Sequence, residues 1–155
     1  MHFEATFPAT RISNSALIYR ADEYSFDVVP SPTGFASVLV NDLNLEVIES
    51  GRVVSVWGIC PHAAWERTVL NPPDAEFGDV FFVTDKPLER SVSIRISQQE
   101  YWPVLADLSC GWVHVKGKNG TTSSIKILTG VVLDLNKQGN LCGIWLRPEE
   151  LPMFG

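Results

Sequence analysis

Alternation between apolar and polar residues at every second position is the pattern that most constrains this chain. The alternation is clear in residues 43–47 (LNLEV), 91–97 (SVSIRIS) and 124–127 (SIKI). A period of two places successive side chains on opposite faces of a β-strand, with one face buried and the other in water. No window of twelve residues shows the sustained three-and-four spacing of an amphipathic helix. The sequence therefore predicts an all-β protein.

Glycines separate the strand-like runs. Gly51, Gly111 and Gly139 each end a short turn between two such runs, and residues 117–120 (GKNG) mark a fourth turn. Glycine suits the end of a hairpin turn because it adopts positive φ without a steric penalty. We therefore expect hairpins at these places, and a positive φ at Gly51 and Gly139.

The 155 residues are enough for one domain with a real core, and no Ser/Gly-rich linker divides the chain. We expect a single β domain over residues 1–155, built as a meander-rich sandwich or open barrel of roughly nine to twelve strands. One or two short helical turns are expected in addition. Their predicted places are near residues 97–100 and at residues 148–151, where a proline is followed by two acids.

Two segments of the chain resemble each other. Residues 45–57 and 133–145 are 88 residues apart throughout, and both read apolar, acidic, apolar, then a turn ending in glycine, then a strand ending in tryptophan. Either the chain has internal pseudo-symmetry, or two well-made hairpins have similar sequences, and the sequence leaves both possibilities open. In either case, the pattern predicts burial of the apolar positions Leu45, Val47, Leu133 and Leu135.

The sequence favours a cytoplasmic protein that does not enter a membrane. Residues 1–8 lack the basic start and apolar run of a signal peptide. The apolar runs, such as residues 80–83, fall far short of the roughly 20 residues that span a bilayer. Cys60, Cys110 and Cys142 are odd in number and scattered, which favours reduced thiols over a disulfide.

Metal binding and catalysis have one candidate loop. Cys60 and His62 are two residues apart, and a zinc site would need Cys110 and His114 as further ligands. Cys110 and His114 are separated by about 13 Å if they lie on one strand, which is too far for one ion. Recognised catalytic motifs are absent from the sequence. We expect no metal, no cofactor and no catalytic residue. A small-ligand-binding or enzymatic β module that uses the Cys60–His62 loop remains the alternative.

Charge is unevenly distributed along the chain. The net charge is −6, made of −8 over residues 1–108, +4 over residues 109–148 and two acids beyond. One stretch concentrates acids beside phenylalanines, and it could face a cationic protein, with a nearby tryptophan as an anchor. The predicted partner-binding residues are Trp65, Asp74, Glu76, Phe77, Asp79, Asp85 and Glu89.

Nucleic acid is a disfavoured partner. If Val113 and Val115 point inward, Trp112, His114 and Lys116 point outward and form part of an aromatic and cationic face. A net charge of −6 argues against this reading, because nucleic-acid-binding domains usually carry a strong basic excess. The sequence does not predict an oligomeric state.

The tryptophan-ended hairpins carry a family resemblance. Residues 43–65, which end in WGICPHAAW, are followed later by WPV at 102–104 and GIWLRP at 143–148. As a compact acidic β domain with hairpins that end in tryptophan, the chain resembles small bacterial immunity proteins that neutralise toxins used between competing cells. The resemblance implies a stoichiometric inhibitor that caps a toxin's active site and has no chemistry of its own. It implies no particular binding residue.

Overall fold

The computed structural model describes residues 1–96 and 100–151, and it confirms the all-β prediction. This part of the chain forms fifteen strands, more than expected because several edge strands are only two or three residues long. The strands are β1 (His2–Thr6), β2 (Ala16–Arg20), β3 (Ser25–Val29), β4 (Ala36–Val40), β5 (Leu43–Val47), β6 (Val53–Ile59), β7 (Glu66–Arg67), β8 (Glu76–Phe77), β9 (Asp79–Val83), β10 (Ser93–Arg95), β11 (Val104–Asp107), β12 (Trp112–Lys116), β13 (Ser123–Leu128), β14 (Val131–Leu135) and β15 (Leu141–Leu146).

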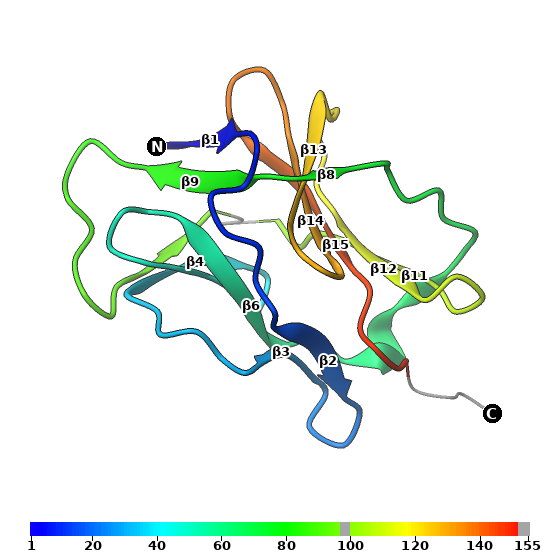
Figure 1. Ribbon diagram of the computed structural model, residues 1–155. Helices are drawn as coiled ribbons and strands as arrows, with labels where there is room; N and C mark the ends of the chain where they lie inside the picture. Colours follow the sequence, from blue (N-terminus) through cyan, green and yellow to red (C-terminus); the bar gives the residue numbers. More distant parts are fainter. Residues whose placement is uncertain (97–99, 152–155) are drawn as a thin grey trace.

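Two large sheets and one two-stranded ribbon make up the fold (Figure 1). The six-stranded sheet has the order β10-β4-β5-β6-β3-β2, and the seven-stranded sheet has the order β7-β11-β12-β15-β14-β13-β8. Strands β1 and β9 form the ribbon, which lies across one end of both sheets. Buried side chains from both sheets and the ribbon belong to one apolar cluster, as expected for a sandwich.

The two sheets repeat one arrangement of five strands. Strands β2 to β6 lie in the order β4-β5-β6-β3-β2, and strands β11 to β15 lie in the order β13-β14-β15-β12-β11. A parallel strand extends each set at the same edge, β10 beside β4 and β8 beside β13. The cross-strand pair Leu45–Val56 recurs as Leu133–Ile144. The similarity of residues 45–57 and 133–145 therefore belongs to a repeat of whole five-stranded units.

The ribbon joins the two units through reciprocal contacts. Strands β1 and β9 are antiparallel, with Phe3 opposite Phe82. The backbone N–H of Phe3 donates to the carbonyl of Gly139 (2.7 Å), and the N–H of Phe82 donates to the carbonyl of Gly51 (2.8 Å). Gly51 and Gly139 occupy equivalent turns and have φ values of +91° and +79°. Each strand of the ribbon thus binds the hairpin turn of a different unit.

Burial follows the predicted alternation closely in the hairpins. The predicted core residues are at most 3% exposed, which confirms the inward face of both hairpins: Leu45, Val47, Leu133 and Leu135. Val113 and Val115 are also fully buried, so they do point inward. Within residues 91–96, the strand that forms is the three-residue edge strand β10, which pairs with β4.

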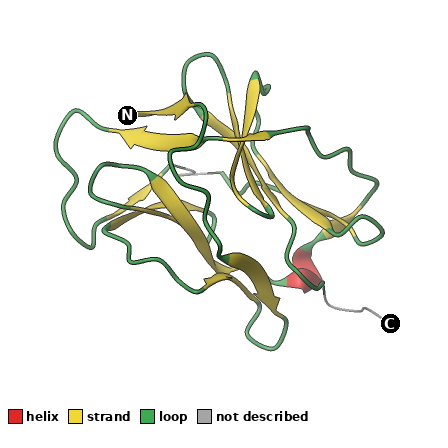
Figure 2. Cartoon of the chain, in the orientation of Figure 1, coloured by secondary structure: helices red, strands yellow, loops and turns green. Residues whose placement is uncertain are grey.

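The described chain contains a short helical turn, as expected, but not at residues 148–151, where Glu149 and Glu150 form a bend. Most of the turn expected near 97–100 lies outside the described residues. The 3₁₀ turn that the described chain contains is His62–Ala64, shown in Figure 2. It follows Pro61, whose φ of −64° is already close to helical, and it redirects the chain from β6 toward β7.

Candidate functional site

The outer face of the six-stranded sheet presents an exposed tryptophan that is held in place. Trp57 of β6 is 45% exposed. Its indole N–H donates to Oε2 of Glu46 (2.9 Å), and the same oxygen accepts from the hydroxyl of Ser37 (2.7 Å). Gly34 leaves room for this carboxylate, because a Cβ there would lie 1.9 Å from Oε1 of Glu46. The ring is therefore fixed while its face stays in water.

The equivalent tryptophan of the other unit is buried. The indole N–H of Trp145 donates to Asp134 (2.8 Å), and Asp134 accepts from the hydroxyl of Ser124 (2.6 Å), which repeats the serine–acid–tryptophan cluster. Trp145 is nevertheless only 6% exposed. The ring of His114 stacks on it at 3.8 Å between centroids. The fold therefore accommodates this tryptophan in a buried position, and the exposure of Trp57 is a property of one unit alone.

The outward-facing residues of β12 do not form an open platform. His114 is covered by Trp145, and Trp112 lies edge-on to the same ring at 6.2 Å. The Nε2 atom of His114 is buried without a hydrogen-bond partner and lies 3.9 Å from Asp134. Burial lowers the pKa of His114 to about 4, against the opposing effect of Asp134. The imidazole is therefore neutral at pH 7 and contributes no positive charge to this face.

The Trp57 face, which we define by Asp42, Glu46, Trp57 and Ile59, combines apolar and acidic groups. Ile59 is 49% exposed and, like Trp57, points outward from β6. Asp42 is exposed in the turn before β5, beside the end of β6. The first unit, residues 16–59, carries six acids and two basic residues, whereas the second, residues 104–146, carries two acids and four basic residues. The face therefore belongs to the acidic half of the molecule.

The predicted acidic stretch does not form one face. Asp79 is 4% exposed, and its carboxylate accepts bonds from the backbone N–H and hydroxyl of Thr10 (3.0 and 2.7 Å). Glu76 begins β8 in the seven-stranded sheet, whereas Asp85 lies beyond the end of β9 in the ribbon, so the two acids stand at opposite ends of the β8–β9 segment. Asp74 and Glu76 are exposed at one end of this segment, and Asp85 and Glu89 at the other.

The two predicted aromatic anchors are also partly or fully covered. Trp65 is 8% exposed and stacks on Phe26 at 6.0 Å. Phe77 is half-buried, with the ammonium of Lys126 5.0 Å from its ring centroid. Asp79 and Trp65 are therefore buried and do not belong to an exposed surface of this structure. A binding role for the remaining exposed residues stays a prediction, now for two separate groups.

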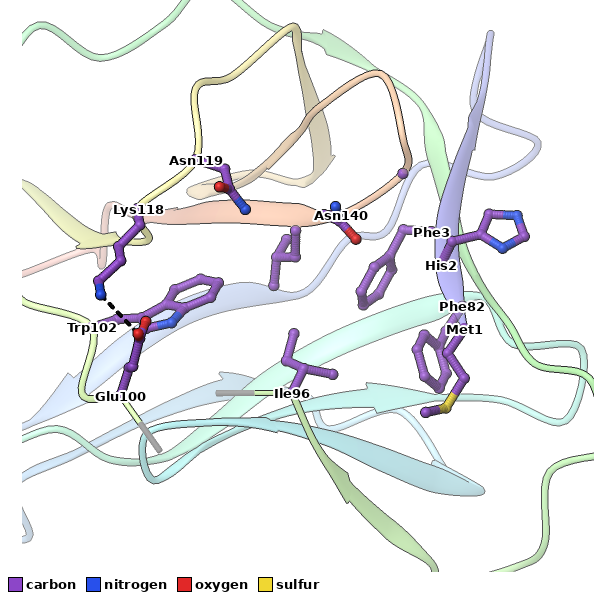
Figure 3. A pocket seen from close by; sticks show the side chains of 12 residues that line it. Met1, His2, Phe3, Phe82, Ile96, Glu100, Trp102, Lys118, Asn119 and Asn140 are labelled. Atoms are coloured by element: carbon purple, nitrogen blue, oxygen red, sulfur yellow. Dashed lines mark hydrogen bonds and ion pairs between the residues drawn. The ribbon is translucent and has the colours of Figure 1, made fainter. Parts of the chain in front are cut away.

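The Cys60–His62 loop is closely packed against the side chain of Tyr19. Tyr19 donates its hydroxyl to the Cys60 carbonyl (2.8 Å), accepts from the backbone N–H of His62 (3.0 Å) and lies 3.2 Å from His62 Nδ1. Burial raises the pKa of the Cys60 thiol to about 11, so the thiol is protonated at neutral pH and is a poor nucleophile. Neither Cys60 nor His62 lines the cavity of about 650 Å³ near β1 and β9 (Figure 3).

The described residues do not assemble a metal site. No group of three His, Cys, Asp or Glu side chains among them is arranged to hold an ion. Cys110 lies in the turn between β11 and β12, where its thiol is 3.6 Å from the Asp107 carbonyl.

Among residues 1–96 and 100–151, no helix is long and apolar enough to cross a membrane.

Comparison with known proteins adds no relatives. A scan against models of protein families finds no match to this chain, and a search of curated proteins finds no match either. The functional argument therefore depends on the residues themselves. The Trp57 face was missed as a site from the sequence. Alternation along 43–47 places Glu46 in the water-facing set, but residues 53–59 (VVSVWGI) do not alternate clearly enough to place Trp57.

Proposed function

We propose that this protein is a non-catalytic protein-binding domain that recognises a basic partner protein through the Trp57 face. The observation that carries the proposal is the clamped and exposed Trp57, 45% exposed where the equivalent Trp145 is 6% exposed. Tryptophan is among the residues that most often dominate binding energy at protein interfaces. A ring already fixed by Glu46 and Ser37 loses little conformational freedom on binding, which favours affinity.

Charge supports a basic partner. The unit that carries Trp57 has a net charge of −4, counted from six acids and two basic residues between 16 and 59. Acidic groups around an apolar anchor attract a cationic surface over distance and raise the association rate. Toxins that attack nucleic acids have cationic active sites. We therefore propose that the protein acts as a cytoplasmic immunity protein, which binds such a toxin directly and caps its active site.

The first test is parallel capture from a lysate of the source organism with immobilised wild-type protein and the Trp57→Ala variant. We expect a basic protein that wild type retains and Trp57→Ala loses. Phe7→Ala is the matched control, because Phe7 is 51% exposed and lies beside Gly78 in the β8–β9 segment, outside the Trp57 face. Circular dichroism should show that both variants remain folded. Identical proteins captured by wild type and Trp57→Ala would contradict the proposal.

The second test measures the purified pair. Trp57→Ala should raise the Kd by about 30-fold or more, which corresponds to a loss of at least ~2 kcal/mol of binding free energy, as at an interface hot spot. Asp42→Lys should mainly slow association and reduce its dependence on salt. Asp74→Lys with Glu76→Lys tests the other acidic group: if only this variant changes the association rate, the predicted acidic stretch is the site instead. Self-association that Trp57→Ala abolishes would assign the face to a second copy and overturn the basic partner.

A further inference from the structure

Two exposed tyrosines flank the Trp57 face. Tyr24 is 49% exposed, and its carbonyl accepts from the backbone N–H of Cys60 (2.7 Å), which places it beside the end of β6. Tyr101 is 63% exposed. Partial burial, together with the nearby Cys60 thiol and Asp42 carboxylate, raises the pKa of Tyr101. The exposed aromatic surface therefore extends beyond Trp57 onto the segments that precede β3 and β11.

Tyr101 is held in this place by the turn that carries Asp42. Asn41 precedes Asp42 between β4 and β5. Its side chain accepts from the backbone N–H of Trp102 (2.9 Å) and donates to the Trp102 carbonyl (2.9 Å), as a paired strand would. These two bonds join the segment of Tyr101 to the turn of Asp42, so the tyrosine and the acid are presented together.

Acids outnumber bases around this surface. Two arginines are nearby, and both already have partners: Arg20 donates to the Asp27 carboxylate (2.7 Å), and Arg95 donates to the Asn41 carbonyl (2.6 Å). A cation that approaches the face therefore meets an excess of carboxylates, which attract it over distance. Five of the six acids of the first unit lie in β3, β5 or the turns that precede these strands: Asp22, Glu23, Asp27, Asp42 and Glu46.

The clamp on Trp57 also changes the ring itself. The face of an aromatic ring is the negative part of its quadrupole. Donation of the indole N–H to the Glu46 carboxylate (2.9 Å) polarises the indole and makes its face more negative. Oε2 of Glu46 takes the bonds from Trp57 and Ser37, and Oε1 accepts none from the described residues. Tryptophan is the best aromatic partner for a cation, and this one is prepared for such a contact.

The second unit shows a planar nitrogen-containing group on the equivalent ring. The imidazole of His114 stacks on Trp145 at 3.8 Å and 10° between planes. Gly143 makes room for it, because a Cβ there would lie 2.8 Å from Nε2 of His114. The equivalent position in the first unit is Ser55, whose side chain takes that room. Among the described residues, no ring stacks on Trp57, so the exposed part of its indole can receive such a group only from a partner.

We infer that the Trp57 face binds an arginine side chain of its partner, with the guanidinium flat on the indole of Trp57. The inference rests on the proposed function and names the partner group that the face selects. A guanidinium is planar, stacks on aromatic rings and keeps donors in its plane for carboxylates such as Glu46 and Asp42. A lysine ammonium is compact and strongly hydrated, and it gains less from the flat ring. Tyrosine, tryptophan and arginine are also enriched together at protein interfaces.

The test adds three capped tetrapeptides, tetra-arginine, tetra-lysine and tetra-citrulline, to the ¹⁵N-labelled full chain. Citrulline keeps the planar shape of arginine without its charge. Trp57→Phe identifies the Trp57 indole signal among the five tryptophans. Tetra-arginine should shift this signal in NMR spectra. It should bind at least about 3-fold more tightly than tetra-lysine and about 10-fold more tightly than tetra-citrulline.

Two charge-removing variants separate the site from the general field of the molecule. Glu46→Gln keeps an acceptor for the indole N–H and removes one negative charge from the face, and it should weaken tetra-arginine binding about 3-fold or more. Asp74→Asn is the matched control, because it removes the same charge from an exposed position in the loop before β8. It should change the affinity by less than about 2-fold.

Three results overturn the inference: equal affinity for tetra-arginine and tetra-lysine, equal losses from Glu46→Gln and Asp74→Asn, or a Trp57 signal that does not move. A basic protein that wild type captures and Trp57→Ala loses would uphold the proposed function in each of these cases. Identical capture by wild type and Trp57→Ala contradicts the proposed function whatever the peptides show, so the two failures are distinguishable.

Discussion

At the scale of single residues, Gly139 shows why a turn needs glycine. Its φ is +79°, and a Cβ there would lie 2.6 Å from the Phe3 carbonyl oxygen. The backbone N–H of the same Phe3 donates to the Gly139 carbonyl, which keeps β1 close to the turn. Gly139→Ala should therefore lower the free energy of unfolding by more than about 2 kcal/mol, because a left-handed backbone already costs an alanine about 1–2 kcal/mol. Chemical denaturation measures the loss.

Gly120 is the matched control for that substitution. No heavy atom lies within 4 Å of a Cβ built at Gly120. Gly120→Ala should therefore change the free energy of unfolding by no more than about 0.5 kcal/mol. Equal effects of the two substitutions would show that the contact between Gly139 and β1 is not formed in solution.

His114 should make stability depend on pH. Burial lowers its folded-state pKa to about 4, below the value of roughly 6.5 in an unfolded chain. Between these two values the unfolded chain binds more protons, so stability falls as pH decreases from about 6.5 toward 4. The total loss is at most about 3 kcal/mol. His114→Phe keeps a ring against Trp145 without titrating. Between pH 6.5 and 5, the free energy of unfolding of this variant should therefore change less with pH than that of wild type. Parallel curves would contradict the assignment.

At the scale of elements, the two hairpins should be equally important to the core. Leu45 and Leu133 occupy equivalent positions in β5 and β14, and both are fully buried. Leu45→Ala and Leu133→Ala should each cost about 2–5 kcal/mol of unfolding free energy, from lost apolar burial and the cavity left behind. Val69→Ala, at a position 83% exposed, should cost less than about 0.5 kcal/mol. A loss below 1 kcal/mol at either leucine would mean that its hairpin is loosely packed.

At the scale of the whole molecule, the ribbon couples the two units. The rings of Phe3 and Phe82 are 5.0 Å apart, and each strand bonds to a different hairpin turn. We expect Phe3→Leu and Phe82→Leu to be non-additive, with a coupling of about 0.5–1.5 kcal/mol in a double-mutant cycle of unfolding free energies. Additivity within about 0.3 kcal/mol would show that the ring contact does not stabilise the junction.

The opposite charges of the two units also belong to this scale. Both units have the same strand order, yet one is acidic and the other basic over residues 16–59 and 104–146. The same backbone geometry therefore carries different surface chemistry in the two units, with the tryptophan exposed in one and buried in the other. This difference is why a binding face is expected on one sheet rather than on both.

Local patterns in the sequence determined the strands, the hairpin turns and the inward face of each hairpin. Alternation in 43–47 and the glycines at 51 and 139 depend only on the pleat of a strand and on backbone sterics, which act within a few residues. The repeat at a spacing of 88 residues was visible for the same reason, although its extension to five strands per unit was not.

Tertiary structure alone decided which polar and aromatic residues reach water. Asp79 is buried because Thr10, 69 residues away, binds its carboxylate, and Trp65 is buried because Phe26 and Tyr19 pack on it. Trp57 and Trp145 end hairpins of similar local pattern, but Trp145 is packed against the rings of His114 and Trp112, whereas Trp57 stays exposed. The cavity beside Trp102 likewise arises where segments distant in sequence meet. Such contacts depend on how sheets and loops cover one another, and no periodicity along the chain encodes that.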